Sequence, residues 1–230
     1  MAERYPAPHR RRSIIGWRLG QVVFRTLYDV QVVDRDRVPR RGAAILVSNH
    51  LGFLDGPLLF GTAPRAANII VKKELFHGFV GWLLRALGQI PIDRTTGDRN
   101  ALMTAVSALD DDRVVGVFPE GTRGRGDVAH IHQGATWLAL RTGAPVVPVT
   151  LLGTRKRDAR GSLPGPRSRV IVAFGEPFTL KGQPGLPGRD QRRIATEQMR
   201  VAMTEHVQTT VERVGMALPE RPPSDVSDNG

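Results

Sequence analysis

Short apolar runs alternate along this chain with longer segments whose apolar residues recur at helical spacing. The apolar runs lie at 30–33, 43–47, 68–71, 89–92, 114–118, 146–150 and 169–174. The helical segments fall between or after them, near 57–60, 74–87, 98–109, 133–141 and 190–214. Alternation of this kind is typical of parallel strands that are joined by crossover helices. The pattern predicts a single α/β domain with a mostly parallel central sheet flanked by helices.

The chain begins with a basic segment, residues 1–28, whose apolar positions predict an amphipathic helix. Apolar side chains from Ile14 to Leu27 stand among arginines that include Arg18 and Arg25. That composition is typical of a helix lying in the headgroup region of a membrane, but an amphipathic helix packed on the core has the same pattern. Charged residues such as Arg18 and Asp29 interrupt the apolar stretch, so it predicts neither a secretory signal nor a membrane-spanning helix.

Composition and charge narrow the class of protein. A chain of 230 residues, 40% hydrophobic and 24% charged, is typical of a globular domain, and the absence of cysteine excludes disulfides and thiolate chemistry. The net charge of +11 comes from residues 1–41 and 155–169. Such a local excess favours an anionic surface, although a solvated face is the alternative. The basic stretches lack the interleaved aromatic residues that stack on bases, so we expect an anionic membrane surface and no nucleic acid as partner.

Two candidate catalytic residues follow the apolar run 43–47. Open α/β sheets bind their ligands at the carboxyl ends of the strands, so this position is a candidate site. Here His50 and Asp55 are separated by four residues. A histidine is suited to take a proton from a hydroxyl at neutral pH, and a carboxylate on its other ring nitrogen would fix its tautomer. On one regular helix the two side chains would point about 140° apart, so the pair requires a strand end and a turn, which Gly52 permits. The alternative is that Asp55 only caps the next helix and His50 is an ordinary loop residue.

Three further polar or unusual segments follow predicted strands. Residues 118–126 set Arg123 among three glycines, which lets the backbone approach a ligand while the guanidinium matches phosphate oxygens. The alternative is a surface turn with a local ion pair. Residues 88–94 end in an aspartate and an arginine, and Lys72 and Lys73 follow the run 68–71. The run 146–150 contains a proline and is predicted to form a wall of the site.

Taken in order, these blocks resemble the glycerolipid acyltransferase family, typified by bacterial 1-acylglycerol-3-phosphate acyltransferases. The blocks are the histidine and aspartate, then Gly-x-Ile-x-Ile-Asp-Arg, Phe-Pro-Glu-Gly-Thr-Arg and Val-Pro-Val, all between residues 43 and 150. The resemblance implies an acyl-CoA or acyl-carrier-protein (acyl-ACP) donor, lysophosphatidic acid (1-acylglycerol-3-phosphate) as the lysophospholipid acceptor, and no metal or cofactor. On this interpretation residues 29–215 form the acyltransferase domain, residues 216–230 are a disordered tail, and the enzyme is peripheral at the cytoplasmic face of the plasma membrane.

The resemblance also implies roles for individual residues. His50 would be the general base and Asp55 its orienting partner. The acceptor phosphate would be contacted by basic side chains, namely Arg94, Lys72 and Lys73. The acceptor-binding turn would consist of Glu120, Gly121, Thr122 and Arg123. One departure concerns this turn, because the family often has serine where Gly124 stands.

These residues favour direct acyl transfer without a protein nucleophile, with backbone N–H groups near the His50 turn as candidates to hold the oxyanion. The apolar stretch 75–84 would lie beside an acyl chain or the bilayer, or else pack on the sheet. Other acceptors stay open: glycerol-3-phosphate, another lysophospholipid or a glycolipid. A non-catalytic basic module that binds membrane or nucleic acid would leave His50 and Asp55 without a purpose. A serine hydrolase is disfavoured because the chain has no Gly-x-Ser-x-Gly segment.

Overall fold

The central sheet of the computed structural model contains seven strands in the order β1-β7-β6-β2-β5-β3-β4. The structure describes residues 10–93, 98–155, 162–182 and 185–220. Neighbouring strands are parallel except β6 and β7. The strands are β1 Asp29–Val33, β2 Ala44–Ser48, β3 Ala67–Lys72, β4 Ile90–Ile92, β5 Val114–Val117, β6 Val146–Leu152 and β7 Arg169–Phe174. The predicted α/β class and mostly parallel sheet are confirmed.

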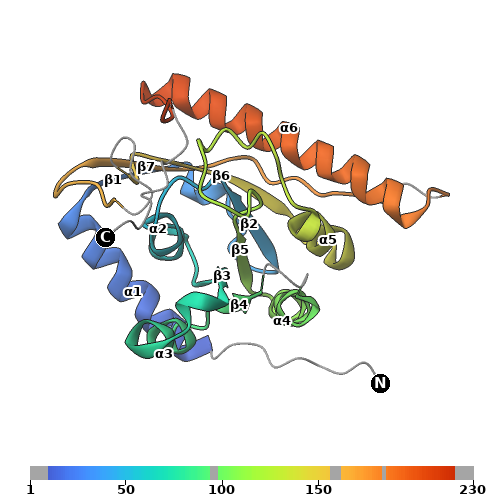
Figure 1. Ribbon diagram of the computed structural model, residues 1–230, viewed down its shortest axis with the longest axis horizontal. Helices are drawn as coiled ribbons and strands as arrows, with labels where there is room; N and C mark the ends of the chain where they lie inside the picture. The colour runs from blue at the N-terminus through green and yellow to red at the C-terminus, as the bar shows by residue number, and fades with distance from the viewer. Residues whose placement is uncertain (1–9, 94–97, 156–161, 183–184, 221–230) are drawn as a thin grey trace, which may run out of the picture.

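Helices cover both faces of this sheet (Figure 1), with α1, α2 and α3 on one face and α4, α5 and α6 on the other. Their bounds are α1 Arg10–Leu27, α2 Asp55–Thr62, α3 Gly78–Ala86, α4 Arg99–Asp110, α5 Gln133–Thr142 and α6 Gly188–Val214. Two short 3-10 helices, Arg35–Arg37 and Lys73–Leu75, complete the fold. The segment predicted as one helix at 74–87 is therefore divided into a 3-10 turn and α3. Gly78, the first residue of α3, has a φ of 55°, which interrupts a continuous helix.

Alternation along the strands separates the core into two layers. In β2, Ile45 and Val47 pack with apolar residues of α4, α5 and α6, whereas Ala44 and Leu46 pack with residues of α2. Every residue of β2 is buried, as expected for a central parallel strand with helices on both faces. The wholly buried strand ends at Ser48, so the first residues able to reach a ligand are those that follow it.

The N-terminal helix α1 packs one side on α2 and leaves the other side exposed. The indole N–H of Trp17 donates to the carbonyl oxygen of Ala63 at 2.8 Å, and Phe24 packs with Leu54 and Leu58. On the opposite side Ile15 is 70% exposed, and Leu19, Val22 and Leu27 are also exposed. One face of the helix therefore packs on the core, as the second interpretation predicted, and the apolar side chains of the other face are exposed. Within the described residues, no helix is long and apolar enough to cross a membrane.

The C-terminal part of the chain stays packed beyond residue 215, where the domain was predicted to end. Met216 and Leu218 lie against Leu152 and Ile171 of the last two sheet strands. The tail predicted to be disordered from residue 216 is therefore ordered at its start, because two of its apolar side chains cover the edge of the core. Residues 221–230 lie outside the described part of the chain.

Candidate active site

The side chain of Asn49 anchors the point at which the chain leaves β2. Its amide nitrogen donates to the carbonyl oxygen of Leu151 at 3.0 Å, and its amide oxygen accepts the N–H of Leu151 at 2.7 Å. Asn49 is fully buried, so both polar ends of its amide are satisfied by one residue of β6. This two-point contact ties the end of β2 to β6 and fixes where His50, the next residue, leaves the sheet.

His50 and Asp55 meet at the carboxyl end of β2. The imidazole Nδ1 lies 2.7 Å from Asp55 Oδ2, and the Asp55 side chain is wholly buried while that of His50 is 12% exposed. The turn through Gly52 brings the pair together as predicted from the sequence. Asp55 is the first residue of α2, where the helix dipole favours a carboxylate. With Nδ1 bonded to a carboxylate, the proton resides on Nδ1 and the lone pair of Nε2 is left to accept a proton.

Asp55 also holds the loop between itself and His50. Its Oδ2 accepts the backbone N–H of Leu51 at 2.5 Å and that of Gly52 at 2.8 Å. The backbone N–H of His50 donates to Glu120 Oε1 at 2.9 Å. The expectation that N–H groups of this turn hold the oxyanion is therefore wrong for these three residues, because all three donate into the protein.

The turn that follows β5 closes over His50. The Phe118 ring stacks on the imidazole with centroids 4.4 Å apart and planes 27° apart. The N–H of Gly124 donates to the carbonyl oxygen of His50 at 2.9 Å. Gly121 has a φ of 69°, and a Cβ at that position would come within 2.6 Å of the His132 ring. The predicted turn thus lies directly against the predicted base, and the need for glycine at 121 is steric as well as conformational.

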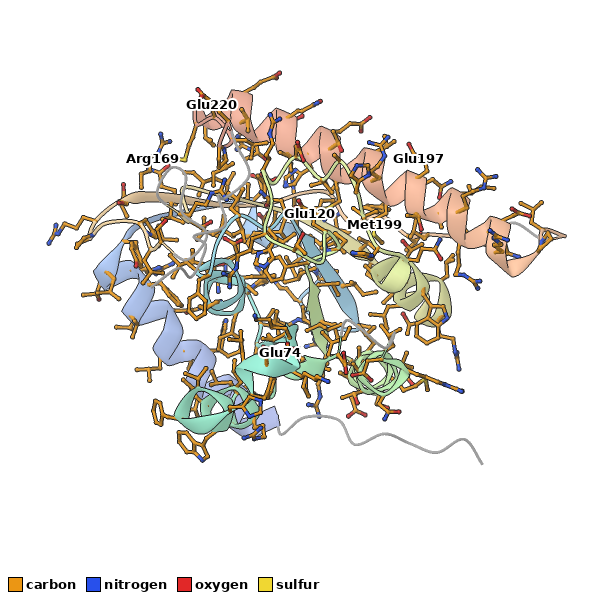
Figure 2. All side chains as sticks on the ribbon, in the orientation of Figure 1. Glu74, Glu120, Arg169, Glu197, Met199 and Glu220 are labelled. Carbon is orange, nitrogen blue, oxygen red and sulfur yellow. The ribbon has the colours of Figure 1, made fainter. Side chains whose placement is uncertain are left out.

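Within this turn, Glu120 and Arg123 have different environments. Glu120 lies among the packed side chains in the middle of the molecule (Figure 2), and burial raises its pKa to about 7. Arg123 lies with its guanidinium 5.5 Å from the centre of the half-exposed Phe53 ring. Thr122 is exposed. Arg123 is half-buried, as Glu120 is, so these two side chains differ in their contacts rather than in their exposure.

The other predicted basic residues lie farther along the same sheet edge. Lys72 ends β3, which is separated from β2 by β5. Lys73 forms an ion pair with Asp93, and the hydrogen bond from this carboxylate raises the pKa of the lysine. Arg94 lies outside the described residues. Every residue of β6 from Val146 to Leu152 is buried, and the strand adjoins the site through the contact of Leu151 with Asn49.

Three contacts of the site were not predicted from the sequence, although the residues belong to the quoted motifs. They are the bridge from Asn49 to Leu151, the stack of Phe118 on His50, and the contact of Arg123 with Phe53. The only sequence signal for them is position, because each residue adjoins or lies within a block that carries a titratable candidate.

Comparison with known proteins places this arrangement in a family. The Acyltransferase family model matches residues 29–152, which hold β1 to β6 and every candidate residue discussed above. A 1-acyl-sn-glycerol-3-phosphate acyltransferase of Bacillus subtilis is 26% identical over 178 residues, covering 76% of this chain and 87% of that protein. The human 1-acyl-sn-glycerol-3-phosphate acyltransferase beta is 34% identical over 146 residues, which is 60% of this chain and 51% of the human protein.

A solved structure agrees with the sequence comparisons. The crystal structure of the 1-acyl-sn-glycerophosphate (LPA) acyltransferase from Thermotoga maritima superposes with a TM-score of 0.64 at 26% identity, covering 86% of this chain and 78% of that one. The family model matches more than half of the sequence, and the matched residues include His50 and Asp55. The chain therefore belongs to the acyltransferase family of enzymes.

Proposed function

We propose that the protein transfers a fatty acyl group from an acyl thioester, acyl-CoA or acyl-ACP, to the free hydroxyl of 1-acylglycerol-3-phosphate, giving phosphatidic acid. The observation that carries the proposal is the His50–Asp55 pair at the end of β2, next to the turn in which Arg123 lies beside the Phe53 ring. The names of the bacterial and human relatives support the same acceptor.

In the proposed mechanism His50 acts as general base. Its Nε2 takes the proton of the acceptor hydroxyl as that oxygen attacks the thioester carbonyl. Asp55 stabilises the imidazolium that forms. A carbon–oxygen bond forms, the carbon–sulfur bond breaks as the tetrahedral intermediate collapses, and the imidazolium can return the proton to the departing thiolate. No protein nucleophile and no metal is needed for this sequence of steps.

Arg123 is the proposed contact for the acceptor phosphate, with Arg94, Lys72 and Lys73 as further candidates. A guanidinium suits a phosphate because its N–H groups can bind two oxygens at once. The ring of Phe53 lies against the Arg123 guanidinium and helps to hold it at the sheet edge. Lys73 is the weaker candidate of the two lysines, because its ammonium already contacts Asp93.

Arg123→Ala is expected to raise the acceptor KM by about 10- to 100-fold, since a charge-assisted hydrogen bond is worth about 1.5 to 3 kcal/mol. The donor KM should change much less. Steady-state kinetics with each substrate varied in turn would measure both values. Arg200→Ala is the matched control, because Arg200 is an arginine paired with Glu197 on the outer side of α6 (Figure 2). Equal changes in the acceptor and donor KM would contradict the assignment.

The product itself tests the function. The protein is incubated with mixed acyl-CoAs and a mixture of lysophosphatidic acid, other lysophospholipids, glycerol-3-phosphate and glycolipid, and the products are identified by mass spectrometry. We expect phosphatidic acid as the main product, and none with His50→Ala. A different acylated product would keep the acyl transfer and replace the acceptor. A protein that consumes no thioester but binds nucleic acid at physiological salt would be the non-catalytic alternative.

We also propose that the enzyme docks on the anionic cytoplasmic face of the plasma membrane as a peripheral protein. The docking surface is the apolar face of α1 and α3, defined by seven exposed side chains: Ile15, Leu19, Val22, Phe79, Val80, Trp82 and Leu83. The two helices touch, because a Cβ on Gly16 of α1 would overlap Leu87 just after α3. Phe79 and Trp82 are 75% and 60% exposed. Exposed apolar side chains gathered on two neighbouring helices are typical of an interaction site.

The charge of the chain supports a membrane as the partner of this face. Arg18 and Arg25 lie on α1 itself, and the chain carries a net charge of +11. Apolar side chains that enter the acyl boundary together with arginines that meet anionic headgroups are the two components of interfacial helix binding.

The double variant Phe79→Glu/Trp82→Glu is expected to bind vesicles at least about 10-fold more weakly than the wild type. Each aromatic side chain withdrawn from the interface forfeits roughly 1.5 to 3 kcal/mol. Cosedimentation with vesicles of phosphatidylcholine and phosphatidylglycerol would measure this. Val201→Glu is the matched control, since Val201 is an exposed apolar residue on α6 at the opposite face of the sheet. Equal binding by the double variant and this control would exclude the proposed surface.

A further inference from the structure

We propose that Glu120 is a positioning residue, which holds the backbone of His50 in place and joins the catalytic base to the acceptor-binding turn. The inference rests on the proposed function, and it changes the role of Glu120. The family resemblance implies that this residue contacts the acceptor, whereas its carboxyl in this structure faces the protein.

The turn holds both backbone polar groups of His50. Glu120 Oε1 accepts the N–H of His50 at 2.9 Å, and the N–H of Gly124 donates to the carbonyl oxygen of His50 at 2.9 Å. The imidazole is held separately, by Asp55 on Nδ1 and by the Phe118 ring on its face. His50 therefore has four restraints, and three of them come from the segment 118–124.

Arg123 lies inside the segment that makes these contacts. In chain order Glu120 accepts the His50 N–H, Arg123 lies beside the Phe53 ring, and the N–H of Gly124 donates to the His50 carbonyl. An acceptor phosphate bound by Arg123 would therefore be positioned by residues 120–124, the same segment that positions His50. The distance between bound acceptor and Nε2 is then determined by one short piece of backbone, rather than by two elements that move independently.

The surroundings of the carboxyl suit an internal hydrogen-bond acceptor better than a ligand contact. Burial is the main cause of its raised pKa, and the charges of Asp127 and Asp55 raise the pKa further, while the His50 N–H lowers it. His132 lies against the adjacent Gly121. A carboxylate that faced the acceptor would repel its phosphate. Glycine at 124 leaves room for the carboxyl, because a Cβ there would lie 3.1 Å from Glu120 Oε2.

Two substitutions separate the reach of this side chain from its charge. Glu120→Gln keeps the length and an acceptor oxygen but has no charge, and Glu120→Asp keeps the charge but is one methylene shorter. They are compared at pH 8, above the pKa of about 7, where wild-type Glu120 is mostly charged, so that the glutamine variant differs from it in charge and the aspartate variant in reach. We expect the glutamine variant to keep kcat within about threefold of wild type. The aspartate variant should lose about 10- to 100-fold in kcat because the base is displaced.

Two further readouts distinguish positioning from other roles. The acceptor KM should stay within about threefold of wild type in both variants, unlike that of Arg123→Ala. In nuclear magnetic resonance, hydrogen exchange at the His50 amide should remain slow in the wild type and the glutamine variant and become faster in the aspartate variant. Thermal melting of each variant shows whether it is folded.

The reverse order, with the aspartate variant active and the glutamine variant impaired, would overturn the proposal, because charge rather than reach would then matter. A rise in acceptor KM in the glutamine variant equal to that of Arg123→Ala would also overturn it. Failure of the proposed function is a separate result, seen as a wild-type protein that forms no phosphatidic acid. In that case the exchange rate of the His50 amide still decides whether Glu120 holds the backbone.

Discussion

Replacing His50 by alanine is expected to lower kcat by at least about 10²- to 10⁴-fold, the contribution that a positioned general base makes to a proton transfer. The substrate KM values should change little, because no binding contact is assigned to the imidazole. The fold should survive the change, since Asp55 Oδ2 keeps the N–H groups of Leu51 and Gly52 as donors. Only one of its three hydrogen bonds is lost.

The absence of cysteine makes this measurement simple. Thiol released from the acyl donor can be followed with a thiol-reactive dye, because the protein itself has no cysteine to react. His77→Ala is the matched control, since His77 is an exposed histidine that precedes α3. A folded His50→Ala protein with near-normal turnover would refute the assignment of the base, whatever the product of the wild-type enzyme.

The local features that could be predicted are those in which neighbouring residues determine the outcome. Apolar runs of four to six residues separated by helical patterns define strands and crossover helices, so the seven strands were found in the sequence. The meeting of His50 and Asp55 followed from a strand end and a glycine within six residues. The antiparallel direction of β7 against β6 was not predictable, because a fully buried strand has the same apolar pattern in either direction.

Contacts between distant segments of the chain could not be predicted in the same way. The bridge from Asn49 to Leu151 joins residues 102 positions apart. The contact of Glu120 with the His50 N–H joins residues 70 positions apart. Without the sheet order, nothing in the sequence indicates that the turn after β5 closes over the end of β2. The direction in which Glu120 points is therefore a property of the folded chain.

The sequence also could not show which apolar residues of α1 pack on the core and which remain exposed. Its apolar residues occupy more of its circumference than one contact face, because Trp17 and Phe24 pack on α2 while Ile15, Leu19 and Val22 remain exposed. A sequence pattern reports that residues are apolar but not which surface covers them. Gly20 and Gly61 determine which side of α1 packs on α2, since a Cβ on Gly61 would lie 2.8 Å from the Phe24 ring. Small residues at this crossing let α1 approach α2.

Replacing Asp55 by asparagine is expected to lower kcat by roughly 10²- to 10⁴-fold while leaving the protein folded. Asparagine has the same size, and its oxygen can still accept the N–H groups of Leu51 and Gly52. It carries no charge to stabilise the imidazolium that forms when His50 takes the proton of the acceptor hydroxyl. Among the residues that the structure describes, Asp55 Oδ1 is buried without a hydrogen-bond partner.

Asp55→Ala separates the catalytic role of this residue from its structural one. Alanine leaves two buried backbone N–H groups without an acceptor, each at a cost of about 1 to 3 kcal/mol, so it should lower the free energy of unfolding more than asparagine does. Both variants should lose kcat to a similar extent, because both lack the carboxylate. Urea unfolding and thiol release, measured on the same samples, test the two effects together. If Asp55→Asn kept wild-type turnover, the carboxylate would serve only to hold the loop, and His50 would need another group to orient it.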